Sequence, residues 1–318
     1  MKRLEAIDQF RGFAILLMVL ANYMNNINVI PSWLKHADDI GYTLIDLIAP
    51  LFVFAMGLTY GLSFHRRLER DGAWNTYQHF LTRFLALMGL GYIFTLVWEM
   101  SGIKPPTINW GLFQALGAAG LITLLVIRLP TFWRLVFGIV LLSVYQVLLD
   151  HYWIKEVLVA PHNGPWGALS WGAMLILATV MADLYHDTRF DRRLYLLVSA
   201  AWVLAGLLGS MWIPLSKHRA SLSYVLLSIG LAGLLFYLFH IGVEKWKWKL
   251  SLLTEWGRNP LLLYLISYVI LGIYALPPVP VWYVQAPLWL VILQILVMVG
   301  ILSWVGRVLN QRKLFFVL

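Results

Sequence analysis

The chain has 318 residues, of which 61% are hydrophobic and only 12% are charged, and its mean hydropathy is +0.76. A soluble domain has about 25% charged residues, so this composition excludes an ordinary soluble protein and indicates one that crosses a membrane several times. Cysteine is absent, which excludes disulfides, a thiolate nucleophile and a cysteine-ligated metal, and the net charge is +9.

Ten apolar segments are each long enough to cross a hydrocarbon core of roughly 30 Å. They cover residues 12–30, 42–64, 80–98, 110–127, 132–149, 166–185, 194–213, 220–240, 259–276 and 287–309. With the N-terminus in the cytoplasm, nineteen of the 24 basic residues lie on the inner side, leaving only Lys35, Lys104, Lys155, Lys217 and Arg219 outside. This is the positive-inside pattern, so we expect both termini in the cytoplasm, and the positive charge does not indicate nucleic-acid binding.

No linker, low-complexity stretch or inverted repeat divides the chain. We therefore predict an all-α integral membrane protein with about ten transmembrane helices in a single domain, residues 1–318, surrounded by membrane lipids. No cleavable signal peptide is visible, and the short chain without a leading extracytoplasmic domain suggests a prokaryotic plasma membrane. The sequence leaves the oligomeric state open, with a homodimer as one option.

In the first segment, Asp8, Arg11 and Asn22 recur at spacings that place them on one helical face. Arg11 and Asn22 are close to three turns apart, so this stripe would run from the inner end toward the outer third of the bilayer. The structural alternative is an Asp-Arg pair at the start of a helix and one asparagine that hydrogen-bonds a neighbouring helix.

His36 lies in the outer loop that leads into the second apolar segment, which carries one carboxylate, Asp46, at its start. A titratable side chain at the edge of an apolar segment indicates a functional site, because burying a polar group has a cost. The alternatives are a loop histidine with no function and, for Asp46, a capping box in Thr43-x-x-Asp46. No metal-binding motif accompanies His36, so we expect no metal site.

Three further positions carry candidate polar side chains. Gln114 lies one turn inside the fourth segment, next to glycines that are typical of close helix contacts. Lys217 belongs to the outer basic cluster of residues 217–219, which is either an acceptor site or a solvated turn. Asn259 precedes Pro260 at the inner face, where an asparagine N-cap is the structural alternative.

These residues, in this order, resemble the family of heparan-alpha-glucosaminide N-acetyltransferase and its bacterial relatives, which are multi-pass membrane acyltransferases. Five ordered blocks carry the resemblance: Asp8-x-x-Arg11-Gly12 with Asn22; His36 with Gly41, Asp46, Pro50, Phe52, Phe54 and Gly57; Gln114 with Gly117; Pro214, Lys217, Ser223 and Tyr224; and Gly257, Asn259 and Tyr264. The chain departs from the family at Asp39, where a tryptophan is usual, at Ala115, where an arginine is usual, and at residues 164–167, where Gly-Pro-Trp-Gly replaces Asp-Pro-Glu-Gly.

The resemblance implies an acyl-CoA donor in the cytosol, foremost acetyl-CoA, and a hydroxyl or amine acceptor on an extracytoplasmic sugar or glycan. Asp8, Arg11, Asn22 and Asn259 would then lie on the donor side, and Asp38, Gln114 and Lys217 on the acceptor side of an outward-facing active site. In the family the histidine is catalytic. His36 would act as a general base, with Asp46 or Asp38 orienting its ring, or as a transient acyl carrier; we favour the base.

A transporter or flippase for a small polar or lipid-linked solute is the competing hypothesis. The stripe of Asp8, Arg11 and Asn22 would then line the conduction path, with His36 as a proton relay. Such proteins typically have inverted repeats and broken helices, neither of which is evident in the sequence. A non-catalytic scaffold is disfavoured because polar residues gather at two opposite ends of the predicted bundle.

Overall fold

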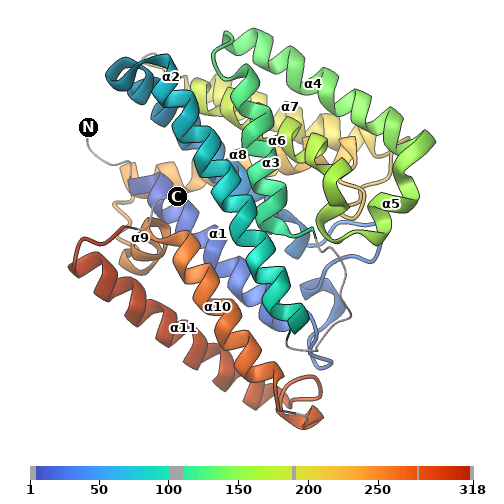
Figure 1. Cartoon of the computed structure of the whole chain (residues 1–318), viewed down its shortest axis with the longest axis vertical. Coiled ribbons are helices and arrows are strands. Elements are labelled where there is room, and N and C mark those ends of the chain that lie inside the picture. The colour runs from blue at the N-terminus through green and yellow to red at the C-terminus, as the bar shows by residue number, and fades with distance from the viewer. Residues whose placement is uncertain (1–4, 101–109, 188–190, 278, 316–318) are drawn as a thin grey trace. The chain divides into compact units, whose positions relative to one another are not determined.

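The computed structural model describes residues 5–100, 110–187, 191–277 and 279–315, and every regular element in these ranges is helical (Figure 1). Lys2, Arg3, Lys104 and Arg189, which contributed to the predicted orientation, lie outside the described residues. The chain forms two compact units: residues 1–37, 42–52 and 235–317 make the first, and residues 38–41 and 53–234 the second.

The first unit is built from α1 (Glu5–Met24), α9 (Ser251–Arg258), α10 (Pro260–Ala275) and α11 (Leu288–Gln311), with short 3-10 helices at Ser32–Leu34, Ile45–Leu47 and Pro280–Trp282. Helix α1 packs mainly on α9 and also on α10. It starts earlier than the predicted segment 12–30, because the polar residues from Glu5 to Arg11 are already helical, and it ends before Asn25 and Asn26.

Helices α1 and α9 cross at a pair of glycines. A Cβ at Gly12 would overlap the Leu253 carbonyl oxygen and lie 3.0 Å from the Gly257 nitrogen, and a Cβ at Gly257 would overlap the Asp8 carbonyl oxygen. Small residues let helix backbones approach this closely. The crossing therefore places the first turns of α1 directly on the end of α9.

Helices α9 and α10 bend by 93° at Asn259. Pro260 occupies the first position of α10, where its missing N–H costs no helical hydrogen bond. The break gives the first unit two helix ends at the start of the predicted apolar segment 259–276.

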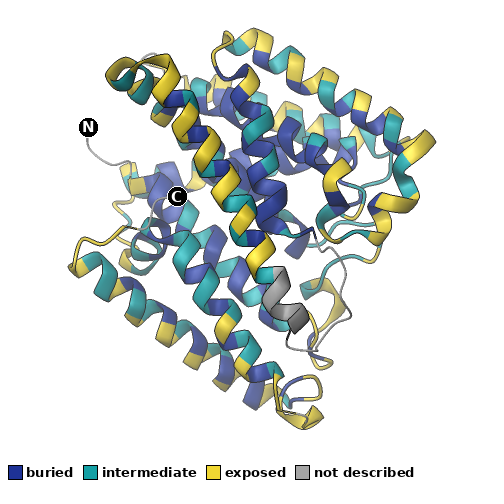
Figure 2. Ribbon diagram, in the orientation of Figure 1, coloured by how far each residue is buried: buried dark blue, intermediate teal, exposed yellow. Residues whose placement is uncertain are grey.

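The second unit contains most of α2 (Ile48–Met100), together with α3 (Leu112–Val126), α4 (Thr131–Leu148), α5 (Ile154–Val159), α6 (Gly164–His186) and α7 (Arg192–Gly209). Helix α8 (Leu222–Glu244) starts in this unit and ends in the first. Helix α6 packs against α3 and α4 and is buried over residues 170–182, as Figure 2 shows in dark blue.

Helix α2 contains most of the second predicted segment, from residue 48 on, and all of the third. Its only non-helical residue is Gly72, with φ 78° and ψ 172°, so the expected polar loop between the two segments is reduced to a kink. The intervening polar stretch stays helical and is stabilised by the Arg67–Asp71 ion pair at 3.0 Å.

Six helices of the described part are long and apolar enough to cross a membrane, or seven if α9 and α10 together form one span. Helix α3 is apolar but shorter. The chain is thus an all-α protein with several candidate membrane spans, whereas ten crossings and cytoplasmic termini stay predictions.

Candidate active site

His36 and Asp46 are in direct contact. The Nδ1 atom of His36 lies 2.8 Å from Oδ1 of Asp46; the imidazole side chain is 27% exposed and the carboxylate is fully buried. His36 follows the helix Ser32–Leu34, and Asp46 lies in the helix Ile45–Leu47, so a short loop brings the two together. Asp46 and Asp38 were the two residues predicted to orient the His36 ring. Asp46 contacts the ring in the structure, whereas Asp38 is exposed.

The second oxygen of Asp46 holds the base of the loop. It accepts hydrogen bonds from the backbone N–H groups of Ala37 at 3.2 Å and Thr43 at 3.0 Å. The Thr43 hydroxyl lies 3.1 Å from the same oxygen and 2.8 Å from the Lys35 carbonyl oxygen. The bond from the Thr43 N–H is the reciprocal half of the predicted capping box, so Asp46 combines a structural contact with the contact to His36.

These contacts define the chemistry that His36 can perform. Since Asp46 is an acceptor through both oxygens, the ring donates its Nδ1–H, and in the neutral imidazole the lone pair is then on Nε2. An imidazole in this tautomer can take a proton or act as a nucleophile through Nε2. The partly exposed ring and the buried carboxylate therefore form a dyad suited to either role.

On the predicted donor side, Asp8 lies between two guanidinium groups. Its Oδ1 is 3.8 Å from Nη1 of Arg11, and its Oδ2 is 3.7 Å from Nε of Arg258. Arg11 also donates to the Gly257 carbonyl oxygen at 3.3 Å. Asp8 and Arg11 thus connect α1 to the end of α9. They also form the Asp-Arg pair at the start of a helix that the sequence analysis gave as the structural alternative.

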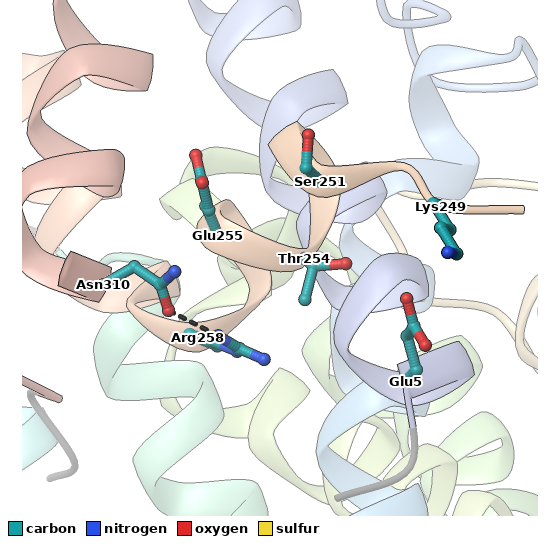
Figure 3. A pocket seen from close by; sticks show the side chains of 7 residues that line it. All are labelled: Glu5, Lys249, Ser251, Thr254, Glu255, Arg258 and Asn310. Atoms are coloured by element: carbon teal, nitrogen blue, oxygen red, sulfur yellow. Dashed lines mark hydrogen bonds between the residues drawn. The ribbon is translucent and has the colours of Figure 1, made fainter. Parts of the chain in front are cut away.

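A recess of about 270 Å³ opens beside this cluster (Figure 3). Its lining comes from α1, α9 and α11 and from the residue that leads into α9: Glu5, Lys249, Ser251, Thr254, Glu255, Arg258 and Asn310. Two cations and two carboxylates make the recess neutral overall, and Arg258 is hydrogen-bonded to Asn310. Asn259, fully buried next to it, donates its side-chain amide to the Leu314 carbonyl oxygen at 3.2 Å.

Asn22, at the other end of the predicted stripe, contacts two tyrosines of α10. Its amide nitrogen is 3.4 Å from the Tyr264 hydroxyl and 3.5 Å from the Tyr268 hydroxyl, and the two hydroxyls are 3.1 Å apart. This is the interhelical hydrogen bond that the sequence gave as the alternative to a functional role. Asn22 and Arg11 are about 17 Å apart along α1 at 1.5 Å per residue, so they are separate places on one helix.

Gln114 and Lys217 belong to the second unit. Gln114 is fully buried, and its Oε1 accepts from the Gly111 N–H at 3.0 Å, as a residue that caps α3 would. The Lys217 carbonyl oxygen accepts from the Asn163 amide at 2.9 Å, and Asn163 also accepts from the Trp171 indole at 2.9 Å. These hydrogen bonds of the Gln114 side chain and the Lys217 carbonyl group are structural.

The sequence did not predict a pairing between Asp39 and Arg219. The Arg219 Nε donates to Oδ1 of Asp39 at 2.8 Å, and its Nη2 donates to Oδ2. This hydrogen bonding lowers the pKa of Asp39 below its ordinary value and raises the pKa of Arg219. The sequence held two signals for this pair: an acidic residue in the His36 loop and an arginine in the basic cluster of residues 217–219, which was predicted to lie on the outer side.

Among the described residues, no group of three or more His, Asp and Glu side chains is arranged to hold a metal ion. The residues present provide a proton acceptor, guanidinium groups and amides instead.

Comparison with known proteins gives a family and similar relatives. The model of the family described as "Heparan-alpha-glucosaminide N-acetyltransferase, catalytic" matches residues 3–242, which confirms the resemblance and ends before α9. Proteins named heparan-alpha-glucosaminide N-acetyltransferase from Homo sapiens and Mus musculus are 44% and 42% identical to the chain over 69 residues. This stretch is 21% of the chain and 10% of each relative, so the chain spans about a tenth of the length of the curated relatives it matches.

Proposed function

The chain belongs to the heparan-alpha-glucosaminide N-acetyltransferase catalytic family, and from this premise we propose that it is a membrane acetyltransferase. It transfers an acetyl group from cytosolic acetyl-CoA to the hydroxyl or amine of an extracytoplasmic sugar or glycan. The observation that carries the proposal is the His36–Asp46 dyad, because its tautomer leaves Nε2 ready to take a proton.

In the simpler of two routes, His36 is a general base. Its Nε2 takes the proton of the acceptor hydroxyl or amine while the acceptor atom attacks the thioester carbonyl. The C–S bond breaks, and the thiolate of CoA leaves and receives the proton from the imidazolium. Asp46 holds the ring and stabilises its charged form across the 2.8 Å hydrogen bond.

In the second route, Nε2 of His36 attacks the thioester carbonyl, the C–S bond breaks and the thiolate of CoA leaves, so that the acetyl group is carried as an acyl-imidazole. The acceptor then attacks this acetyl group, the bond to Nε2 breaks, and the proton of the acceptor passes to the thiolate. Both routes need the same tautomer. Labelled acetyl-CoA without acceptor separates them, because only the second route leaves the label on His36.

The donor side is assigned to Asp8, Arg11, Asn22 and Asn259, with the recess beside α9 as the entrance. Asp38, Gln114 and Lys217 are assigned to the acceptor side, with the active site facing outward. Arg11 reaches the end of α9, and Arg258 is the last residue of that helix. This supports the first assignment, because guanidinium groups suit the phosphates of CoA. Acetyl-CoA should raise the thermal stability of the protein, and Arg11→Gln should abolish that increase.

The decisive experiment is replacement of His36. Radiolabelled acetyl-CoA is added to permeabilised membranes that contain the protein, and label in the carbohydrate fraction is measured. General-base catalysis contributes about 10²- to 10⁴-fold, so His36→Ala should reduce transfer by at least about a hundredfold. A folded His36→Ala variant with near-normal transfer would refute the proposal.

One observation favours transport instead. The helix break between α9 and α10 is of the kind that transporters use to bind solutes. The two functions differ in what acetyl-CoA does. Solute flux in vesicles without stabilisation by acetyl-CoA would support the transporter, whereas stabilisation that depends on Arg11 would support the enzyme.

A further inference from the structure

Asp39 and Arg219 form a two-point ion pair only three residues along the chain from His36. In addition to the two bonds from the guanidinium, the Ser216 hydroxyl donates to Oδ1 of Asp39 at 3.1 Å. A guanidinium that binds both oxygens of a carboxylate fixes orientation as well as distance. The pair therefore sets the position of the backbone at Asp39.

The backbone next to Asp39 is held to the same segment. The Gly41 N–H donates to the Leu215 carbonyl oxygen at 2.8 Å. Gly41 has φ 139°, a backbone conformation that favours glycine. A side-chain contact and a backbone contact thus join residues 39–41 to residues 215–219.

The segment that presents Arg219 is itself fixed by the surrounding helices. Three of its carbonyl oxygens accept side-chain hydrogen bonds: Arg219 from Tyr145 at 2.7 Å, Lys217 from Asn163 at 2.9 Å and Ala220 from Ser170 at 2.6 Å. Tyr145 lies in α4 and Ser170 in α6. Arg219 is therefore presented by an ordered backbone rather than by a free surface turn.

The loop from Lys35 to Asp46 has little burial to hold it in place. Its residues 35–44 are partly or fully exposed. Segments with few buried apolar contacts open easily, so hydrogen bonds have to provide the order. Asp46 holds the base of the loop through Ala37 and Thr43, and Arg219 with Leu215 holds its tip.

We propose that Asp39 and Arg219 are positioning residues for His36, holding its loop in the conformation in which Nδ1 meets Asp46. The inference rests on the function proposed above. Neither side chain takes part in the reaction. They keep the imidazole where the acceptor and the thioester meet, and small displacements of a catalytic group cost about ten- to a hundredfold in rate.

The test compares Asp39→Asn, Arg219→Gln and the double variant with the intact protein. Transfer of label from acetyl-CoA to membrane carbohydrate gives the maximal rate and the KM for acetyl-CoA. We expect each single variant to lose at least about tenfold in maximal rate with an unchanged KM for acetyl-CoA, since the donor is bound elsewhere. The double variant should be no slower than either single one, because one broken pair is the common cause.

Hydrogen exchange supplies a readout that needs no acceptor. Residues 35–46 should exchange at least about tenfold faster in both single variants, because the tip of the loop is released. The matched control is the exposed pair of Arg70 and Asp71, which has the same two-point geometry, with bonds of 2.7 and 3.0 Å, in α2. Arg70→Gln should change neither the transfer rate nor the exchange of residues 35–46.

Several results would overturn the inference. Unchanged exchange in residues 35–46, a single variant with more than half the normal rate, or losses that multiply in the double variant would each do so. A slower Arg219→Gln together with a faster Asp39→Asn would mean that Arg219 binds an anionic acceptor instead. If His36→Ala is inactive while Asp39→Asn is normal, only this inference fails; if His36→Ala stays active, the proposed function fails.

Discussion

The Asp46→Asn substitution tests the tautomer of His36. The side chain keeps its size, but one carboxylate oxygen becomes an NH₂ group. At the Oδ2 position of the intact protein, the N–H groups of Ala37 and Thr43 both need an acceptor. The amide oxygen should therefore occupy that position, which places the NH₂ group against Nδ1 of His36.

The size of the expected loss in transfer rate follows from the cost of the opposite amide orientation, with the NH₂ group at the Oδ2 position. It would leave two backbone N–H groups facing a donor, at about 1–3 kcal/mol each, or at least about 2 kcal/mol in total. At about 1.4 kcal/mol for each factor of ten, fewer than about 4% of the molecules would have it. In the favoured orientation Nδ1 becomes the acceptor and Nε2 carries the proton, so His36 can neither take a proton nor attack.

We therefore expect Asp46→Asn to lower the transfer rate by at least about 25-fold, up to the 10²- to 10⁴-fold range of a lost general base, with acetyl-CoA binding unchanged. The assay is label transfer to membrane carbohydrate, with thermal unfolding in detergent as the check on folding. Asp71→Asn, which changes a partly buried carboxylate in α2, is the control. A folded Asp46→Asn variant with more than half the normal rate would refute the assignment of the tautomer and with it the role of the dyad.

Three further predictions concern stability. Gly12→Ala should lower the unfolding free energy by about 3 kcal/mol, because the new methyl group meets the Leu253 carbonyl oxygen. The control is Gly300→Ala, which should be neutral or stabilising because a Cβ at Gly300 meets no atom within 4 Å. Equal melting temperatures of the two variants would contradict the close crossing of α1 and α9. Asn163 has φ 68°, a backbone conformation that is strained for alanine but not for glycine. Both Asn163→Ala and Asn163→Gly lose the same hydrogen bonds, so the alanine variant should be about 1 kcal/mol less stable than the glycine variant. A higher melting temperature for the alanine variant would exclude backbone strain at this position. Arg219 lowers the pKa of Asp39, and His218 acts in the same direction, so the pair stabilises the protein above the ordinary carboxyl pKa and loses this effect as pH falls through the lowered value. The difference in melting temperature between the intact protein and Asp39→Asn should have its full size at about pH 5 and shrink in more acidic solution. A difference that grows as the pH falls below about 5 would contradict the pairing.

The dyad could be predicted from the sequence because its members are ten residues apart. A histidine in a polar loop followed by a single carboxylate at the start of an apolar segment is a local pattern, and the resemblance added the role of the histidine. The sequence pattern did not show which of the two carboxylates, Asp46 or Asp38, contacts the His36 ring. It depended on the turn at Thr43, where backbone hydrogen bonds direct the Asp46 carboxylate to His36.

The helix boundaries show a similar division. The apolar segments were found, but the break expected between residues 64 and 80 is only the kink at Gly72. A charged stretch can be helical when ion pairs such as Arg67–Asp71 line its face, and hydropathy alone does not reveal this.

By itself, the sequence determined that this is a helical protein with membrane-length apolar segments, that no thiol chemistry is available, and that His36 and Asp46 belong to one loop. These properties depend on composition and on spacing along the chain. Tertiary structure alone decided that Arg219 meets Asp39, 180 residues away, and that Arg11 reaches the end of α9. Such pairs depend on how helices pack, and packing joins residues whose separation in the sequence carries no periodic signal.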